Sequence, residues 1–304
     1  MNREFWQSVV DADGAIPEGH SAAELAPELL GYLGSPDPWL RDEVAFEVLS
    51  AWIVRDNLFP PAELRAIGDT LAANLQVGLA EPGDERILLR SFSALVLNKV
   101  IESDNWHASL EAADIHRWMD AVCAYIVAER DTRGQLPGQG WAHAIAHAAD
   151  ALWVLAQSRH LAAPELLHIL GTIAARVMQP TEQPFLYNED QRLGYAAVAV
   201  FQRDLLDLPA ITAWVEQIAH PDGEWRAIYA TPENTIACQN TTTFLRSLYF
   251  QLLLGINPPA WYPDPSFFLR VPALRDEVLN LLIGAQKAMD RGFYRKDETN
   301  AEHA

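Results

Sequence analysis

Three titratable side chains lie close together in the alanine-rich stretch 140–150: His143, His147 and Asp150. Residues three or four apart share one face of an α-helix, so a helix over this stretch would align all three in one polar stripe. Two imidazoles four residues apart can bind one metal ion, and a carboxylate can complete or orient that set. The same groups can hold an organic ligand or brace neighbouring helices through hydrogen bonds. The spacing therefore leaves three roles open.

Trp141 and Arg133 extend the candidate site toward an organic ligand. Tryptophan offers an aromatic face, while arginine and histidine offer charge-assisted donors, a combination that suits an anionic or aromatic group. Four further arginines near the starts of helical segments are candidates for the same site: Arg41, Arg90, Arg192 and Arg246. They could instead pair with nearby acids such as Asp42, Glu189 or Asp190 and tie adjacent elements together.

The metal interpretation has specific weaknesses. No Glu follows His143, unlike in the helical zinc motif His-Glu-x-x-His, and Asp150 lies about 10 Å from His143 along a helix axis. The sequence also lacks a glycine-rich phosphate loop, a Gly-x-Ser-x-Gly elbow and a Cys/His zinc spacing. A divalent metal held by His143 and His147 is therefore the alternative. It would serve a hydrolase with Asp150 or Glu189 as general base.

The elements that must position these residues are helices. Capping residues, prolines at helix starts and apolar residues at three-and-four spacing predict about twelve helices, with almost no strand signal. The predicted all-α chain has apolar helical runs over 25–33, 39–54, 61–71, 85–101, 108–128, 141–157, 164–178, 190–206, 209–219, 241–254 and 272–289.

A repeat of roughly 50 residues organises these helices. Its members begin with a cation or an imidazole followed by an apolar face: Arg41, Arg90, His143, Arg192 and Arg246. We therefore predict an α/α superhelix of about five to six HEAT-like helical hairpins, with a closed α/α toroid as the alternative. We expect one helical-repeat domain over 1–304, a frayed tail over 295–304, and an extended strap from Asn257 to Phe268 that packs over the last hairpin.

The third repeat differs from the others at two positions. Four and seven residues after the leading cation, the other repeats carry apolar side chains, whereas the third carries His147 and Asp150. Burying a polar group without a partner costs on the order of 1 to 3 kcal/mol. These two side chains must therefore be satisfied locally or line a solvated pocket, and they are the strongest site signal in the chain.

Composition limits the partners. Half of the residues are apolar, and 22 Lys and Arg stand against 41 Asp and Glu, for a net charge of −19. Such a chain repels phosphate backbones and anionic lipid surfaces, so we expect neither a nucleic-acid nor a membrane partner. Without a secretory leader pattern, and with only Cys123 and Cys238, the chain is expected in the cytoplasm with inert core thiols.

Residues 131–134, Asp-Thr-Arg-Gly, and 140–150, Gly-Trp-Ala-His-Ala-Ile-Ala-His-Ala-Ala-Asp, resemble the hallmark of the bacterial domain of unknown function 2785 family. Residues 41–43, 90–93 and 240–249 are similar to further motifs of that family. The resemblance implies a helical-repeat fold in a bacterial protein and supplies no activity. It favours the Gly-Trp-Ala-His segment as the functional centre.

We therefore expect a cytosolic helical-repeat protein that binds a small anionic or aromatic ligand, or a peptide, in a concave site. His143, His147, Asp150 and Trp141 would form its centre. The alternative is the metal-dependent hydrolase. The sequence leaves the oligomeric state open.

Overall fold

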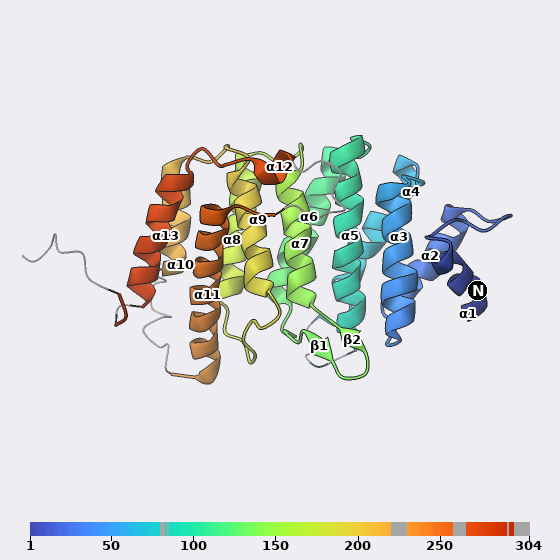
Figure 1. Cartoon of the computed structure of the whole chain (residues 1–304), viewed down its shortest axis with the longest axis horizontal. Coiled ribbons are helices and arrows are strands. Elements are labelled where there is room, and N and C mark those ends of the chain that lie inside the picture. Colours follow the sequence, from blue (N-terminus) through green and yellow to red (C-terminus); the bar gives the residue numbers. More distant parts are fainter. Residues whose placement is uncertain (80–82, 84, 220–229, 258–265, 291, 295–304) are drawn as a thin grey trace, which may run out of the picture.

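The computed structural model describes residues 1–79, 83, 85–219, 230–257, 266–290 and 292–294. The helices follow one another in chain order from α1 (Arg3–Asp11) and α2 (Ala22–Tyr32) at one end to α13 (Arg275–Met289) at the other (Figure 1). The predicted tail and most of the predicted strap lie outside the described residues.

The helices form pairs arranged in two layers. The first layer consists of a helix over 39–55, made of η1 (Trp39–Phe46), α3 (Glu47–Ser50) and η2 (Ala51–Arg55), then α5 (Ile87–His107), α7 (Ala144–Gln157), α9 (Glu189–Phe201) and α11 (Pro232–Leu254). The second layer consists of α4 (Pro61–Asn74), α6 (Ala112–Ala128), α8 (Ala163–Met178), α10 (Leu208–Ala219) and α13. A short helix, α12 (Ser266–Leu269), lies between α11 and α13 in the chain.

Each layer is built by contacts between successive repeats. In the first layer α5 packs on α7, α7 on α9 and α9 on α11, while in the second layer α4, α6, α8, α10 and α13 pack in the same order. Because α1 and α13 lie at opposite ends (Figure 1), the array is open and the closed toroid is not formed. The predicted all-α helical array is confirmed.

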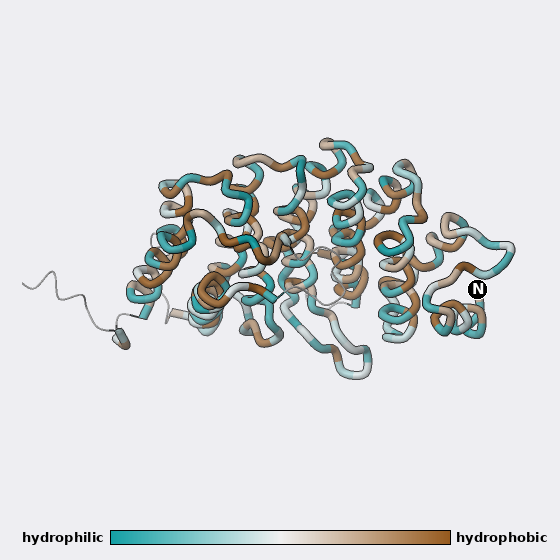
Figure 2. The backbone as a smooth tube through the Cα atoms, turned by 45° about the horizontal axis from the view of Figure 1, so that its top comes forward, coloured by the Kyte–Doolittle hydropathy of each residue, from teal (hydrophilic) through white to brown (hydrophobic). Residues whose placement is uncertain are grey.

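Amphipathic helices produce this layered packing. Hydrophobic and hydrophilic residues alternate along the helices (Figure 2), so outer helices such as α4 and α8 have one face for the neighbouring layer and one for solvent, whereas α7 and α9 at the centre are buried on nearly all sides. The centre of the array is tightly packed because α7 presents buried alanines, among them Ala144, Ala148 and Ala151, which let α5 and α9 approach closely.

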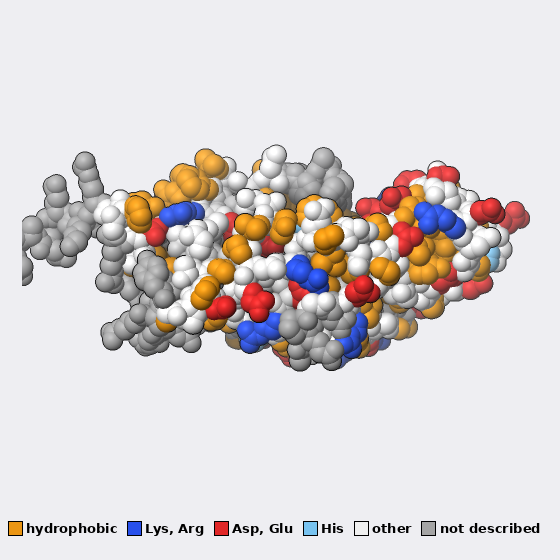
Figure 3. Space-filling view, turned by 90° about the horizontal axis from the view of Figure 1, so that it is seen from below, with side chains coloured by type: hydrophobic (Ala, Val, Ile, Leu, Met, Phe, Trp, Pro, Cys, Tyr) orange, Lys and Arg blue, Asp and Glu red, His pale blue; other side chains and the backbone are white. Residues whose placement is uncertain are grey.

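The surface charge and the lengths of the helices are relevant to the predicted absence of nucleic-acid and membrane partners. Seen from below, basic side chains form separate groups among acidic and apolar ones (Figure 3). Within the described part of the chain, no helix combines the length and apolarity needed to cross a bilayer.

The helix over 39–55 has the predicted bounds to within a residue but an unexpected interior. Its first and last segments, η1 and η2, are π-helical and flank the short α-helical segment α3. π-helical turns are rare and frequently occur at functional sites. Apolar spacing did not reveal them, because a shift of the backbone hydrogen bond from i−4 to i−5 leaves most of the amphipathic pattern intact.

Candidate functional site

The segment before α7 is a tight hairpin, and this corrects the predicted helix over 141–157. Strand β1 (Gln135–Leu136) pairs antiparallel with β2 (Gly140–Trp141), so that Gln135 faces Trp141. The helix begins only at Ala144, and His143 before it adopts a left-handed conformation with φ 50°. The helical stripe therefore contains only His147 and Asp150.

His143 nevertheless lies beside His147, because the hairpin carries it to the start of α7. Its ring centroid is 4.4 Å from that of Trp141, 5.7 Å from that of His147 and 5.9 Å from that of Tyr187. The rings of Trp141 and Tyr187 are 5.7 Å apart. We call these four side chains, Trp141, His143, His147 and Tyr187, the imidazole cluster.

Tyr187 is the member that sequence reasoning missed. It belongs to the connection before α9, and its ring packs directly on the backbone of Gly134. A Cβ atom at Gly134 would lie 1.9 Å from Cδ2 of Tyr187, so only glycine admits the ring there. The carbonyl of Gly134 also accepts hydrogen bonds from the backbone N–H groups of Ala142, at 2.7 Å, and His143, at 3.3 Å. The absence of a side chain at Gly134 therefore allows the ring of Tyr187 to reach the cluster.

Hydrogen bonds fix the tautomer of His147. The Ser91 hydroxyl donates to the carbonyl of Ala142, so its oxygen accepts from Nδ1–H of His147 at 2.8 Å. The Nε2 atom of the neutral ring is then left with its lone pair. Burial lowers the pKa of His147 well below its usual value, and the charge of Arg192 lowers it further. The ring is therefore neutral at pH 7.

His143 is neutral as well and carries an unsatisfied atom. Burial, followed by the charge of Arg192, lowers the pKa of His143 to about 4. Its Nε2 atom is buried and has no hydrogen-bond partner among the described residues. Such an atom in a native structure calls for a specific explanation, such as a bound ligand or water.

Asp150 bonds to Arg192 on α9. The guanidinium Nη1 of Arg192 lies 2.5 Å from Oδ2 of Asp150, and the two side chains are 33% and 21% exposed. Burial raises the pKa of Asp150, while the charges of Arg192 and Lys99 oppose that shift. The sequence suggested Glu189 or Asp190 for this arginine, but the structure pairs it across the seam between α7 and α9.

The other predicted arginines have separate partners. Arg90 is fully buried and bonds through Nε and Nη2 to the carboxylate of Glu129, at 2.7 and 3.1 Å, and through Nη1 to the carbonyl of Val77. Arg133 pairs with Asp131 in its own turn. Arg246 pairs with Asp290 just after α13, at 2.6 Å. These contacts support the bracing role that the sequence left open for the arginine row.

Arg41 joins the first layer helix to the tip of the hairpin. It is fully buried, donates to the carbonyls of Ser35 at 2.9 Å and Gln139 at 2.7 Å, and pairs with Asp42 as the sequence suggested. A Cβ atom at Gly140 would lie 3.2 Å from Nη2 of Arg41, which is a close approach. The backbone that carries Trp141 is therefore held from 98 residues away in sequence.

The donor set offers little for a metal. The described residues contain no group of three His, Cys, Asp or Glu side chains arranged to hold a metal ion. Asp150 bonds to Arg192, and Glu189 is buried, with its Oε2 accepting the backbone N–H of Tyr187 at 2.8 Å. Among the residues that the structure describes, His143 and His147 would thus be the only protein ligands of such a metal ion.

Comparison with protein families supports the family resemblance found in the sequence. Residues 75–250 match the family described as "Protein of unknown function (DUF2785)". The chain belongs to this family. No curated protein and no solved structure matches it. The imidazole cluster of this DUF2785 protein lies inside the matched range, whereas Arg41 lies outside it.

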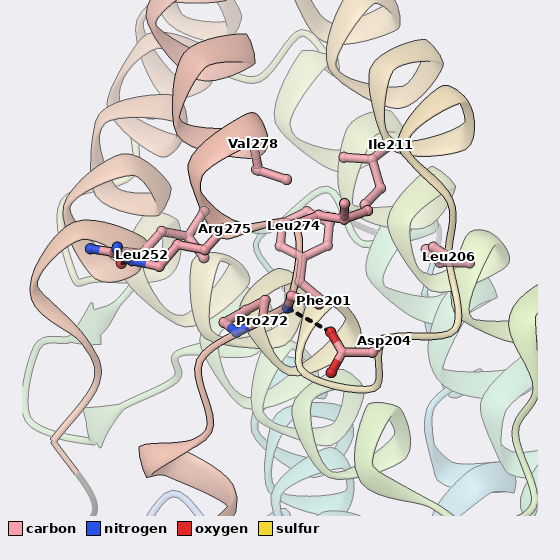
Figure 4. A pocket seen from close by; sticks show the side chains of 10 residues that line it. Phe201, Asp204, Leu206, Ile211, Leu252, Pro272, Leu274, Arg275 and Val278 are labelled. Carbon is pink, nitrogen blue, oxygen red and sulfur yellow. Dashed lines mark hydrogen bonds between the residues drawn. The ribbon is translucent and has the colours of Figure 1, made fainter.

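Four cavities of the DUF2785 protein lie elsewhere. The smallest, about 90 Å³, is lined mainly by apolar side chains of α9, α10, α11, α13 and the connections beside them, and Asp204 at its edge accepts the backbone N–H of Ala273 (Figure 4). Two larger ones, about 650 and 590 Å³, lie at the C-terminal end beside α12 and between α2 and α4. The largest, about 1010 Å³, lies between the helix over 39–55 and α5. None of these four is lined by His143 or His147.

Proposed function

We propose that this DUF2785 protein binds a small anionic aromatic molecule at the imidazole cluster. The observation that carries this proposal is the buried, unpartnered Nε2 of His143, which belongs to a ring that contacts Trp141 and Tyr187. An unsatisfied buried polar atom costs about 1 to 3 kcal/mol, so a ligand group that pairs with it recovers that free energy.

The neighbouring rings favour an aromatic ligand. Trp141 is 45% exposed although it packs against His143, so part of its surface remains free for a planar group. Tyr187 is half-buried beside it. Aromatic pairs prefer edge-to-face or offset contacts at such distances, and each adds about 0.5 to 1.5 kcal/mol to simple burial.

The local charge favours an anion. Burial is the main reason for the low pKa of His147, and the charges of Arg192 and Arg41 lower it further, so two guanidinium groups act on this imidazole. This holds although the whole chain carries a net charge of −19. An anionic group is therefore stabilised at the cluster.

The alternatives receive less support. A metal-dependent hydrolase needs a third protein ligand, and within the described ranges none accompanies the two imidazoles. The small extent of the cluster favours a small molecule over a peptide at this place.

We also propose a cytoplasmic location and a HEAT-like repeat, from the acidic composition, the two cysteines and the paired helices. Burial raises the pKa of Cys123 to about 11, which makes it an inert thiol.

Isothermal titration calorimetry tests the proposal with benzoate and phenyl phosphate as anionic probes and benzamide as the neutral control. We expect saturable binding of an anionic probe, and weakening by about tenfold or more in His143→Ala and Trp141→Ala. His168→Ala, an exposed imidazole on α8, is the matched control and should bind as the wild type does. The absence of saturable binding by both anionic probes, or equal binding in His143→Ala, would overturn it.

A further inference from the structure

Arg176 of α8 is a fully buried cation that forms no ion pair with the described residues. Its Nη1 atom donates to the carbonyl of Glu129 at 2.8 Å and to Oε1 of Gln179 at 2.7 Å. Its Nε and Nη2 atoms are also buried, but neither has a hydrogen-bond partner among the described residues. We infer that this Nε–Nη2 edge of Arg176 binds a small carboxylate-type anion, and we call the place the Arg176 site.

Arg90 shows what the same edge of a buried guanidinium binds in this molecule. Its Nε and Nη2 donate to the two carboxylate oxygens of Glu129, at 2.7 and 3.1 Å, while its Nη1 donates to the carbonyl of Val77. Arg176 also uses Nη1 for a backbone carbonyl, but no carboxylate of the described residues meets its Nε–Nη2 edge. Two parallel N–H groups match the two oxygens of a planar carboxylate. The equivalent contact at Arg176 therefore calls for an anion from outside the chain.

The charge of Arg176 also calls for a counter-ion. Burial lowers the pKa of Arg176 to about 10, so the guanidinium still carries its charge at pH 7. A buried charge is costly unless it is paired and hydrogen-bonded. The charges of Glu129 and Glu189 act on Arg176, but Glu129 pairs with Arg90 and Glu189 accepts a backbone N–H. Arg130 adds a second positive charge nearby, so a bound anion would be stabilised here.

A second unpartnered donor comes from α11. The Cζ atom of Arg176 is 5.7 Å from the ring centroid of Phe185, whose backbone N–H donates to Oδ1 of Asn240 at 2.9 Å. This bond fixes the orientation of the amide, and Nδ2 of Asn240 is buried without a hydrogen-bond partner among the described residues. The hydroxyl of Thr241 donates to the carbonyl of Val177 at 2.9 Å, which joins α11 to α8 next to Arg176. Guanidinium and amide N–H groups are donors, so this neighbourhood suits an anion and not a cation.

The enclosure of the Arg176 site limits the anion to a small one. The two nitrogens that would bind it are shielded from solvent, and Phe185 beside them is buried as well. The site has one uncompensated positive charge, which matches a monovalent anion. Formate, acetate and bicarbonate have this charge and the planar pair of oxygens. The inference does not depend on the imidazole cluster, because none of its side chains bonds to Arg176.

Thermal unfolding of the full chain in sodium formate tests the inference, with sodium chloride at equal ionic strength as the reference. We expect formate to raise the unfolding midpoint in a saturable manner, because a ligand that binds only the folded state stabilises it. Arg176→Met should abolish this rise. Arg176→Lys keeps the charge but loses the two parallel donors, so the apparent affinity for formate should fall by about tenfold. Arg65→Met, at a partly exposed arginine of α4, is the matched control and should respond as the wild type does.

Carbon-13 NMR of labelled formate gives a readout that needs no variant. We expect the wild type to broaden the formate signal, and excess unlabelled acetate to restore it by competition. The result also separates this site from the proposed aromatic site, since His143→Ala should keep the full response to formate.

Three outcomes would overturn the inference. The first is a wild type that shows neither a saturable rise beyond that in chloride nor a broadened formate signal. The second is an unchanged response to formate in Arg176→Lys or Arg176→Met. The third is a response that is lost in His143→Ala, since formate would then bind at the imidazole cluster. Failure of benzoate and phenyl phosphate to bind would leave the response to formate unaffected.

Discussion

Two arginines that hold equivalent places in the second and fourth repeats differ in their surroundings. Arg90 is fully enclosed, and three of its nitrogens bond to Glu129 and Val77. Arg192 keeps a third of its side chain exposed and pairs with Asp150 next to the neutral imidazoles. Both arginines therefore join neighbouring elements, but Arg90 does so from a fully buried position and Arg192 from a partly exposed one beside the imidazole cluster.

Removing each guanidinium in turn is the strongest test of this contrast. Arg90→Leu removes the ion-pair partner of the buried Glu129, whose carboxylate keeps a hydrogen bond from the backbone N–H of Asp131, so the free energy of unfolding should fall by about 3 to 5 kcal/mol. Arg192→Leu breaks a partly exposed pair and should cost less than about 1 kcal/mol. Urea unfolding monitored by circular dichroism measures both. Equal losses in the two variants would contradict the comparison.

Gly134→Ala tests whether the hairpin positions the site through Tyr187. The added methyl group would overlap the ring of Tyr187, and overpacking of this kind typically costs about 1 to 3 kcal/mol. Gly171→Ala on α8 is the matched control, because no atom lies within 4 Å of its added Cβ and alanine is the better helix former. We expect thermal unfolding to separate the two variants, with Gly171→Ala neutral or stabilised. A Gly134→Ala protein as stable as the wild type would show that Tyr187 moves freely.

The pH dependence of stability reports on the charge that Arg192 places near His143. Burial and Arg192 lower the pKa of His143 from 6.5 to about 4, so between these values the unfolded chain binds a proton that the folded chain does not. Titration of His143 should therefore lower the free energy of unfolding as the pH falls from 6.5 to about 4. NMR titration measures the pKa directly, and Arg192→Gln should raise it. A His143 ring that titrates near pH 6.5 in the wild type would refute the burial.

His147→Leu should have the smallest effect. Leucine keeps an apolar contact with Phe92 and loses one hydrogen bond to Ser91, whose hydroxyl still donates to Ala142. We expect the free energy of unfolding to change by about 1 kcal/mol or less. A loss above about 3 kcal/mol in denaturant unfolding would instead assign the imidazole to the structural network.

Much of the array followed from the sequence because apolar spacing and caps are local signals. The polar pair His147 and Asp150 stood out because the other repeats are apolar there. The recurring cation did not mark one place in the helices, because Arg246 lies in the middle of α11, which begins at Pro232 and not near residue 241. The start of α7 was wrong because Gly138 and Gly140 take positive φ values and turn the chain into a hairpin. The alanine-rich sequence after that turn had been predicted as one continuous helix over 141–157.

The members of the imidazole cluster and the partners of the arginines depend on long-range contacts, which the sequence pattern does not specify. Tyr187 reaches the cluster from a connection more than forty residues along the chain, and its position depends on the missing side chain at Gly134. The arginine row looked uniform in sequence, yet burial and partner choice give each member a separate role. Such assignments depend on which helices meet, and a single repeat period does not specify that.

The bond from Arg41 to the carbonyl of Gln139 has a consequence for how this protein is divided. The range that matches the family begins at residue 75, yet the guanidinium that bonds to the hairpin tip comes from before it. A fragment trimmed to residues 75–250 would leave that carbonyl without its donor, and the tryptophan-bearing strand would be held only by contacts within the fragment, among them its pairing with β1. The structural unit that holds the hairpin in place thus extends beyond the range that matches the family.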